Sequence, residues 1–410
     1  MVAVQVFTAH SRLTTFAVMT SRSVSEGGAP PSWAFRYQAG DYPPYGYTAD
    51  IVGFGVRPTL GTLEVVTVTR GEDGPFAGAT AFPGGFVEWH SDDDAATAAI
   101  RELDEETGLG RPAHLETLDT YDTNGRDPRQ WAGFERDGKW ISTGARIVSK
   151  SFLALFGSAG DALAPKTGED ATAAAWRSVY EFLPWEDVRN AEGQMLARSF
   201  GKELLDGWAR VRDKEEAQAR GRRVKAAFPA RLSDWNEERA PERYRLLLAA
   251  GLVPEAHRDK WGRLTSTRTS WRGEALAFDH RVMLADALGR LRGTLKYIPG
   301  VLSALLGREV ALPVLQAACE AIGGRPIVTP NFRRVMTATH GLLVRRAGHA
   351  SVRAAKKGVA PSLYAFRADV ETLRLDPSIR MPWGQLAPSG LATVRRGTWK
   401  EPTAGRGTRK

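Results

Sequence analysis

The residues best suited to chemistry are three glutamates about a quarter of the way along the chain. Glu102, Glu105 and Glu106 stand at positions i, i+3 and i+4, so a helix would project all three from one side. Carboxylates held together repel one another unless a cation joins them, and hard oxygen ligands with room for water suit Mg²⁺ or Mn²⁺. The spacing therefore predicts a divalent-metal site.

The segment that must position these glutamates has the features of one amphipathic helix. Acidic residues 92–94 precede it, where the helix macrodipole favours negative charge. Gly108 falls where a left-handed C-terminal cap is expected. Apolar residues recur at helical spacing on a separate arc, so the helix can bury one stripe and present the acidic one. That stripe consists of Ala96, Ala99, Ile100 and Leu103.

The run from Phe82 to Leu109 resembles the Nudix box, in which a glycine precedes a glutamate and then Arg-Glu-aliphatic-any-Glu-Glu-any-Gly-aliphatic. Residues 101–109 fit this pattern at every position. Asp93 stands where the pattern has its first glutamate, and Gly85 precedes Asp93 by eight positions where the pattern has six. The resemblance implies a Nudix fold and Mg²⁺-dependent cleavage of a nucleoside diphosphate derivative.

The same resemblance implies roles for individual side chains. The three box glutamates would hold the metal ion, with Glu105 as the expected general base. Arg101 and Arg70 could stabilise diphosphate charge, since planar guanidinium donors suit phosphate oxygens. A structural ion pair within the motif is the alternative for Arg101. Further candidate substrate contacts are Gly84, Gly85 and Arg129.

Composition limits the classes of protein to which the chain can belong. Its 410 residues, 42% hydrophobic and 25% charged, leave room for two or three domains. A single cysteine, Cys319, excludes an internal disulfide framework and any multi-cysteine zinc site. Since no apolar run approaches the roughly 20 residues needed to span a bilayer, we expect a cytoplasmic protein with no membrane partner.

The net charge of +9 is unevenly distributed along the chain. Residues 331–410 contain 16 Lys or Arg and 4 Asp or Glu, which gives this end a net charge of +12. The residues before it therefore sum to −3. A strongly basic end of this kind indicates binding to nucleic acid.

The pattern within the basic half predicts a winged helix-turn-helix. A helix over about 312–322 is followed by the turn 323–326 and a second helix through Thr339. Residues 342–346 and 362–366 are expected to form two strands around a basic wing tip. A solvated basic hairpin beside ordinary packed helices is the alternative. The predicted contacts to double-stranded DNA are Asn331, Arg333, Arg334, Arg353, Lys356 and Lys357.

A second resemblance, to the Nudix-related transcriptional regulators of NAD metabolism, is found in both halves of the chain. It implies a Nudix domain that senses ADP-ribose, a winged helix that binds operator DNA, and a homodimer. Two functions stay open: hydrolysis of ADP-ribose to AMP and ribose 5-phosphate, or sensing without hydrolysis. The segments that carry this resemblance are 125–129, 146–149, 276–281, 287–293, 324–326 and 331–334.

The expected fold class is therefore α/β: a Nudix α/β/α sandwich with a mixed sheet, a helical connector and a C-terminal winged helix-turn-helix. Asp137-Gly138 predicts a tight hairpin inserted into the Nudix domain. The expected organisation is a loose leader at 1–33, a Nudix domain at 34–190, a helical connector at 191–274, a winged-helix domain at 275–368 and a basic tail at 369–410.

Overall fold

The computed structural model describes most of the chain between Tyr45 and Val370. The expected leader and nearly all of the basic tail lie outside the described residues, as does the wing tip with the predicted DNA contacts Arg353, Lys356 and Lys357. No helix of the described ranges is both long and apolar enough to cross a membrane. The described ranges are 45–58, 61–157, 171–266, 272–298, 300–339, 342–349 and 362–370.

The N-terminal half is built on a seven-stranded sheet with the order β3-β2-β1-β8-β5, to which β4 is added beside β1 and β9 beside β2. β1 and β8 pair in parallel from Tyr45↔Arg146 to Phe54↔Leu155, while the other pairs are antiparallel. The predicted mixed sheet is confirmed. The strands are β1 Tyr45–Arg57, β2 Thr62–Arg70, β3 Thr80–Ala81, β4 Gly84–Phe86, β5 His114–Tyr121, β8 Arg146–Leu155 and β9 Ala171–Ser178.

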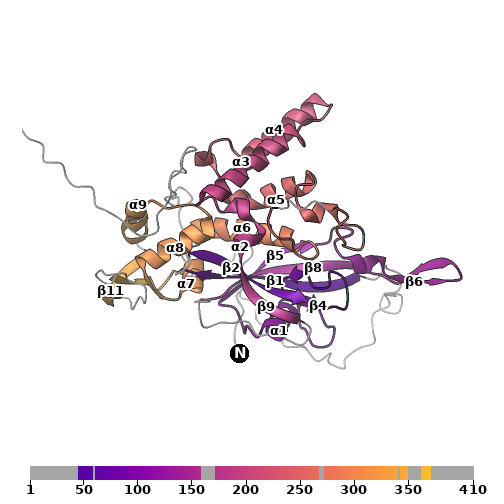
Figure 1. Ribbon diagram of the computed structural model, residues 1–410. Coiled ribbons are helices and arrows are strands. Elements are labelled where there is room, and N and C mark those ends of the chain that lie inside the picture. The colour runs from indigo at the N-terminus through magenta and orange to yellow at the C-terminus, as the bar shows by residue number, and fades with distance from the viewer. Residues whose placement is uncertain are drawn as a thin grey trace, which may run out of the picture.

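Helices cover both faces of this sheet (Figure 1). On one face, α1 (Ala95–Thr107) buries Leu103 in a cluster that includes Ile51 and Val66 of the strands. On the other face, Phe54 and Leu153 belong to a larger core that continues through the connector into the C-terminal helices. The sandwich therefore takes its second helical layer from the rest of the chain.

A hairpin of β6 (Gly133–Arg136) and β7 (Lys139–Ser142) extends away from the sheet (Figure 1). Its turn places Asp137 at φ 53° and Gly138 at φ 71°, the left-handed conformations that a two-residue hairpin turn needs. The hairpin predicted from the Asp-Gly pair is confirmed.

The connector packs against both halves of the molecule. Arg243 of the connector and Arg292 of the next long helix each approach Glu186 to 2.6 Å, and all three side chains are fully buried. Asn190 accepts a hydrogen bond from the Gly193 N–H and caps the start of α3. The elements here are α2 Val179–Phe182, η3 Pro184–Glu186, α3 Ala191–Asp206, α4 Lys214–Ala227, η4 Leu232–Asp234, η5 Glu237–Arg239, α5 Ala240–Ala249 and η6 Pro254–His257.

The C-terminal half begins with a long helix and ends in a compact helical unit with a small sheet. Three helices pack beside a three-stranded sheet with the order β10-β12-β11, and Gly324 at φ 64° ends the helix before the turn. This is the predicted winged helix-turn-helix arrangement, although the short elements α7 and β10 were not predicted. The elements are α6 His280–Tyr297, α7 Gly300–Leu306, β10 Glu309–Ala311, α8 Leu312–Gly323, α9 Thr329–Arg334, the π-helical turn η7 Val335–Thr339, β11 Leu343–His349 and β12 Ser362–Phe366.

Candidate functional site

Local capping fixes the helix that carries the predicted glutamates. Asp94 accepts a hydrogen bond from the Thr97 N–H at 2.8 Å and begins α1, and Gly108 ends it in the left-handed conformation at φ 62°. Leu103 lies in the core below. Both predicted ends of the helix are confirmed, and its acidic side faces away from the core.

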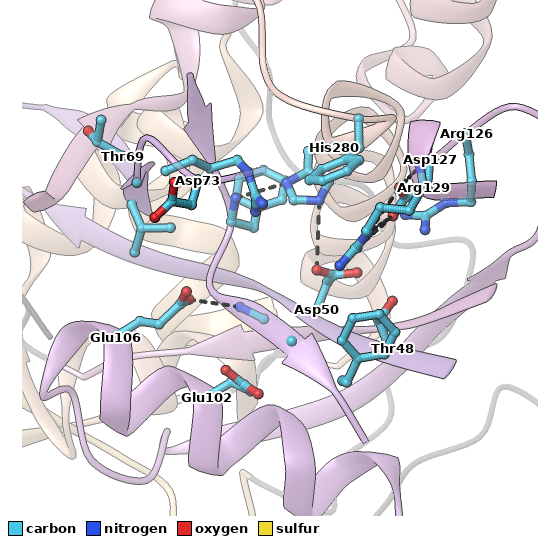
Figure 2. Close-up of a pocket in the computed structure, with 18 of the residues that line it drawn as sticks. Thr48, Asp50, Thr69, Asp73, Glu102, Glu106, Arg126, Asp127, Arg129 and His280 are labelled. Carbon is cyan, nitrogen blue, oxygen red and sulfur yellow. Dashed lines mark hydrogen bonds and ion pairs between the residues drawn. The ribbon is translucent and has the colours of Figure 1, made fainter. Parts of the chain in front are cut away.

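An open cavity of about 570 Å³ lies over this acidic side (Figure 2). It combines residues of strands β1, β2 and β4, the helix α1, the loop before η2 (Pro128–Trp131) and the start of α6. Of the predicted site residues, the cavity brings together Glu102, Glu106, Arg70, Gly84, Gly85 and Arg129. Other lining residues include Thr48, Asp50, Asp73, Arg126, Asp127, Phe278 and His280.

Glu102 and Glu106 project from α1 toward the cavity (Figure 2). The Gly84 N–H donates to Glu106 Oε2 at 3.0 Å. A Cβ atom at Gly85 would overlap the Glu102 carboxylate, so any other residue there would push this carboxylate out of its present position. Burial raises the pKa of Glu106 to about 8, and the nearby charge of Glu102 adds to the rise. Two crowded carboxylates of this kind favour a cation or a proton between them.

Glu105 has different surroundings from the other two glutamates. Its side chain is 58% exposed and accepts a bond from Arg101 Nη1 at 3.0 Å. Arg101 also binds Asp92 at 2.9 Å and the Phe86 carbonyl at 3.1 Å, so it joins the helix to the loop before it. Arg101 and Glu105 are not among the described residues that line the cavity.

Two of the three predicted metal ligands thus face the cavity, and the third is exposed. Arg101 Nη1 donates to both Glu102 and Glu105. Within the described ranges, no three His, Cys, Asp or Glu side chains are already arranged to hold a metal ion. The donor set itself fits Mg²⁺ or Mn²⁺, because Glu102 and Glu106 supply hard oxygens, and a cation would favour their charged forms against the burial that raises the pKa of both.

Two guanidinium groups are fixed in the opposite wall of the cavity. Arg70 donates to the Pro75 carbonyl at 2.9 Å and lies over the Phe278 ring at 4.8 Å. Arg129 binds Asp127 at 2.6 Å and lies over the Phe86 ring at 4.7 Å. Burial lowers the pKa of Arg70, and the neighbouring Arg129 charge lowers it further. This arrangement suits a ligand that carries negative charge between the two groups.

Several cavity residues were not identified from the sequence as site residues. Arg126 makes a bidentate pair with Asp279 at 2.7 and 2.9 Å, across 153 residues of chain. His280 accepts a hydrogen bond from the Phe82 N–H, across 198 residues. Both residues lie in runs on which the resemblance to the Nudix-related regulators rests. That resemblance marked the runs as important but gave Arg126 and His280 no role. For Asp50, an acidic residue within an apolar strand is the available signal.

The winged helix presents a second candidate surface, for nucleic acid. On α9 and the following turn, Phe332, Val335 and Met336 are buried. The three described residues among the predicted DNA contacts, Asn331, Arg333 and Arg334, are exposed on the same segment. The face that points outward is therefore polar and basic, as DNA contact requires.

Residues 50–199 match the family model of the NUDIX domain. The ADPR responsive transcriptional repressor NtrR of Acinetobacter baylyi is 35% identical over 97 residues, which are 24% of this chain and 37% of that protein. The chain thus matches little more than a third of the length of this curated relative.

Two of the similar solved structures are of one protein. Shewanella oneidensis NrtR complexed with a 27mer DNA has 20% identity and a TM-score of 0.45, over 80% of this chain and 96% of that one. The NUDIX domain of the same protein, complexed with ADP ribose, has 23% identity and a TM-score of 0.29, over 37% of this chain and 84% of that one.

The mixed sheet, the capped acidic helix and a cavity lined by both carboxylates and guanidinium groups define an α/β protein. With the match over residues 50–199, this part of the chain is a Nudix domain, and the rest adds a connector and a winged helix.

Proposed function

We propose that the Nudix domain binds ADP-ribose and hydrolyses its diphosphate with Mg²⁺ or Mn²⁺. We also propose that the winged helix to which this domain is fused binds DNA. One observation carries the proposal: Glu102 and Glu106 share a cavity with Arg70 and Arg129. Carboxylates suited to a divalent ion and guanidinium groups suited to phosphate oxygens are the two requirements of diphosphate cleavage.

In this mechanism the chain's own residues orient the diphosphate and limit its motion. A divalent ion, when bound by Glu102 and Glu106, would supply charge neutralisation and lower the pKa of a water molecule. Arg70 and Arg129 would hold phosphate oxygens from the opposite wall. Water adds to one phosphorus, the bond from that phosphorus to the bridging oxygen breaks, and AMP and ribose 5-phosphate leave.

Glu105 is proposed as the general base, which requires its carboxylate to leave the hydrogen bond to Arg101. The test is product analysis after incubation with ADP-ribose and Mg²⁺, with Glu105→Gln measured beside the unaltered protein. AMP release that is lost in the folded variant supports hydrolysis with Glu105 in this role. Full release by Glu105→Gln would contradict the assignment of the base.

A second function, sensing without hydrolysis, is favoured by the exposed basic face of α9 and by the name of the Acinetobacter relative, a transcriptional repressor. In this proposal ADP-ribose shifts a homodimer between DNA-bound and released states. Binding of ADP-ribose without AMP release, together with ligand-dependent loss of operator binding, would make sensing the function of the domain.

A further inference from the structure

His280 contributes a hydrogen-bond donor to the cavity from outside the Nudix sheet. Its ring lies 5.3 Å from the Phe82 ring and parallel to it, and the Phe82 N–H donates to Nδ1 at 2.9 Å. An Nδ1 atom that accepts carries no hydrogen, so Nε2 carries it in the neutral ring. Burial lowers the pKa of His280 to about 3, which keeps the ring neutral. The Nε2–H is thus a fixed donor.

Asp50 places an acceptor beside this donor. Its Oδ2 accepts a hydrogen bond from the Ser149 hydroxyl, while Oδ1 lies 3.7 Å from His280 Nε2. That separation is too long for a hydrogen bond. Both residues line the cavity and face each other in Figure 2. The pair therefore offers a ligand one donor and one acceptor, side by side.

The chemistry of this pair selects the kind of group it can hold. A phosphate oxygen accepts from Nε2–H but is repelled by the Asp50 carboxylate, and an ammonium group donates to Asp50 but gives His280 no acceptor. An alcohol hydroxyl does both through one oxygen. An oxygen about 2.8 Å from each atom fits between two atoms 3.7 Å apart.

We infer that Asp50 and His280 form a subsite for a ribose hydroxyl of the ligand, in which the hydroxyl donates to Asp50 Oδ1 and accepts from His280 Nε2–H. This inference rests on the proposed ligand of the Nudix domain. It assigns substrate selectivity to a side chain of α6, the helix that leads into the winged helix.

Two substitutions at His280 separate this role from a structural one. His280→Asn retains an acceptor near the Nδ1 position for the Phe82 N–H but has no group at the Nε2 position. His280→Gln places an amide nitrogen near the Nε2 position and can restore the donor. Asp50→Asn tests the acceptor independently, and it serves in place of His280→Asn if that variant does not fold.

The measurement is titration calorimetry with three probes, with Ca²⁺ in place of Mg²⁺ to prevent turnover. ADP-ribose is compared with ADP, which lacks the terminal ribose, and with an ADP-ribose analogue that lacks both hydroxyls of the adenosine ribose. Since a hydrogen bond to a charged group contributes about 1.5–3 kcal/mol, we expect at least one analogue to bind about tenfold or more weakly than ADP-ribose.

That preference should fall to within about twofold in His280→Asn and return in His280→Gln. An unchanged preference in folded His280→Asn or Asp50→Asn would overturn the subsite while leaving ADP-ribose as the ligand. Equal binding of all three probes by the unaltered protein would also overturn the subsite. Failure of the unaltered protein to bind any of them would instead overturn the proposed function.

Discussion

The two ends of helix α6 lie in buried polar surroundings that differ in how completely their charges are paired. Near its C-terminal end, Arg292 and Arg243 each contact one oxygen of Glu186 at 2.6 Å. At its N-terminal end Asp279 is paired with Arg126, but the next residue, His280, faces Asp50 across 3.7 Å without a hydrogen bond. We call the Glu186, Arg243 and Arg292 cluster the closed network, because its carboxylate is paired with both guanidinium groups. The cavity around Asp50 and His280, which also contains Glu106, is the open network.

The pKa shifts of the carboxylates follow the same division. Burial alone would raise the pKa of Glu186, but Arg243 and Arg292 hold it below its usual value. In the cavity burial raises the pKa of Glu106 to about 8, despite the hydrogen bond from Gly84. The closed network holds the fold together, whereas the open one contains a buried carboxyl group whose charged form needs a cation as partner.

The largest effect on stability is expected from opening the closed network with Glu186→Gln. The substitution leaves two buried guanidinium groups without their anion, so the free energy of unfolding should fall by about 3–5 kcal/mol. Denaturant unfolding measures it, with Glu192→Gln on the exposed side of α3 as control. A loss below about 1 kcal/mol, within the range of a surface ion pair, would contradict the comparison.

The pH dependence of unfolding sharpens the same prediction. Because the folded pKa of Glu186 is depressed, its contribution is present above the unfolded pKa and is lost as pH falls through the folded value. Glu186→Gln should therefore flatten the acid limb of stability against pH. An equally steep acid limb in the variant would assign that limb to other carboxylates.

Glu106→Gln tests the open network and should change stability and turnover in opposite ways. Removing a buried carboxylate that Glu102 repels should leave the unfolding free energy unchanged or slightly raised. Loss of a proposed metal ligand should lower Mg²⁺-dependent AMP release by at least about 100-fold. Asp104→Asn, exposed on the same helix, is the control. A loss of unfolding free energy as large as that in Glu186→Gln would show that Glu106 stabilises the fold instead.

Arg333→Ala combined with Arg334→Ala tests whether the winged helix acts apart from the cavity. Two lost phosphate contacts should weaken duplex binding by about tenfold or more and reduce the slope of log affinity against log salt by about 2. Fluorescence anisotropy with a duplex selected from a random library measures both. Arg222→Ala with Arg223→Ala on α4 is the matched control. Unchanged salt dependence would remove α9 from the DNA interface.

The smallest effect is expected from Arg129→Lys, which keeps the charge in the cavity wall. A lysine cannot reproduce the planar contacts with Asp127 and the Phe86 ring. We expect ADP-ribose affinity to fall by roughly fivefold, the value of one hydrogen bond. Calorimetry checks it, and a loss as large as that in Arg129→Ala would show that orientation matters more than charge.

Local rules were enough to predict the helix that carries the glutamates. Its start at Asp94 and its end at Gly108 each depend on residues within a turn or two. Of the predicted apolar stripe, Ala99 and Leu103 are buried, whereas Ala96 and Ile100 are half-buried. The strands and the Asp137-Gly138 turn are local in the same sense. By contrast, α6 begins after Asp279, whose side chain makes no capping hydrogen bond and instead pairs with Arg126, 153 residues away.

The site was predicted in part for the same reason. Glu102 and Glu106 lie on one helix, so their spacing places them together. Asp50 and His280 meet because β1 and α6 pack against each other, 230 residues apart in the sequence. Such contacts are set by tertiary packing, which residue spacing in one sequence does not reveal.

The start of α6 also determines how the protein can be divided. A fragment that ended at residue 190 would lose the partner of Arg126, the acceptor for the Phe82 N–H and the apolar cover over one face of the sheet. Such a fragment would expose a broad hydrophobic surface and aggregate more readily than the whole chain. The sheet of the Nudix domain thus depends on the start of α6 for one wall of the cavity and for the cover of one face.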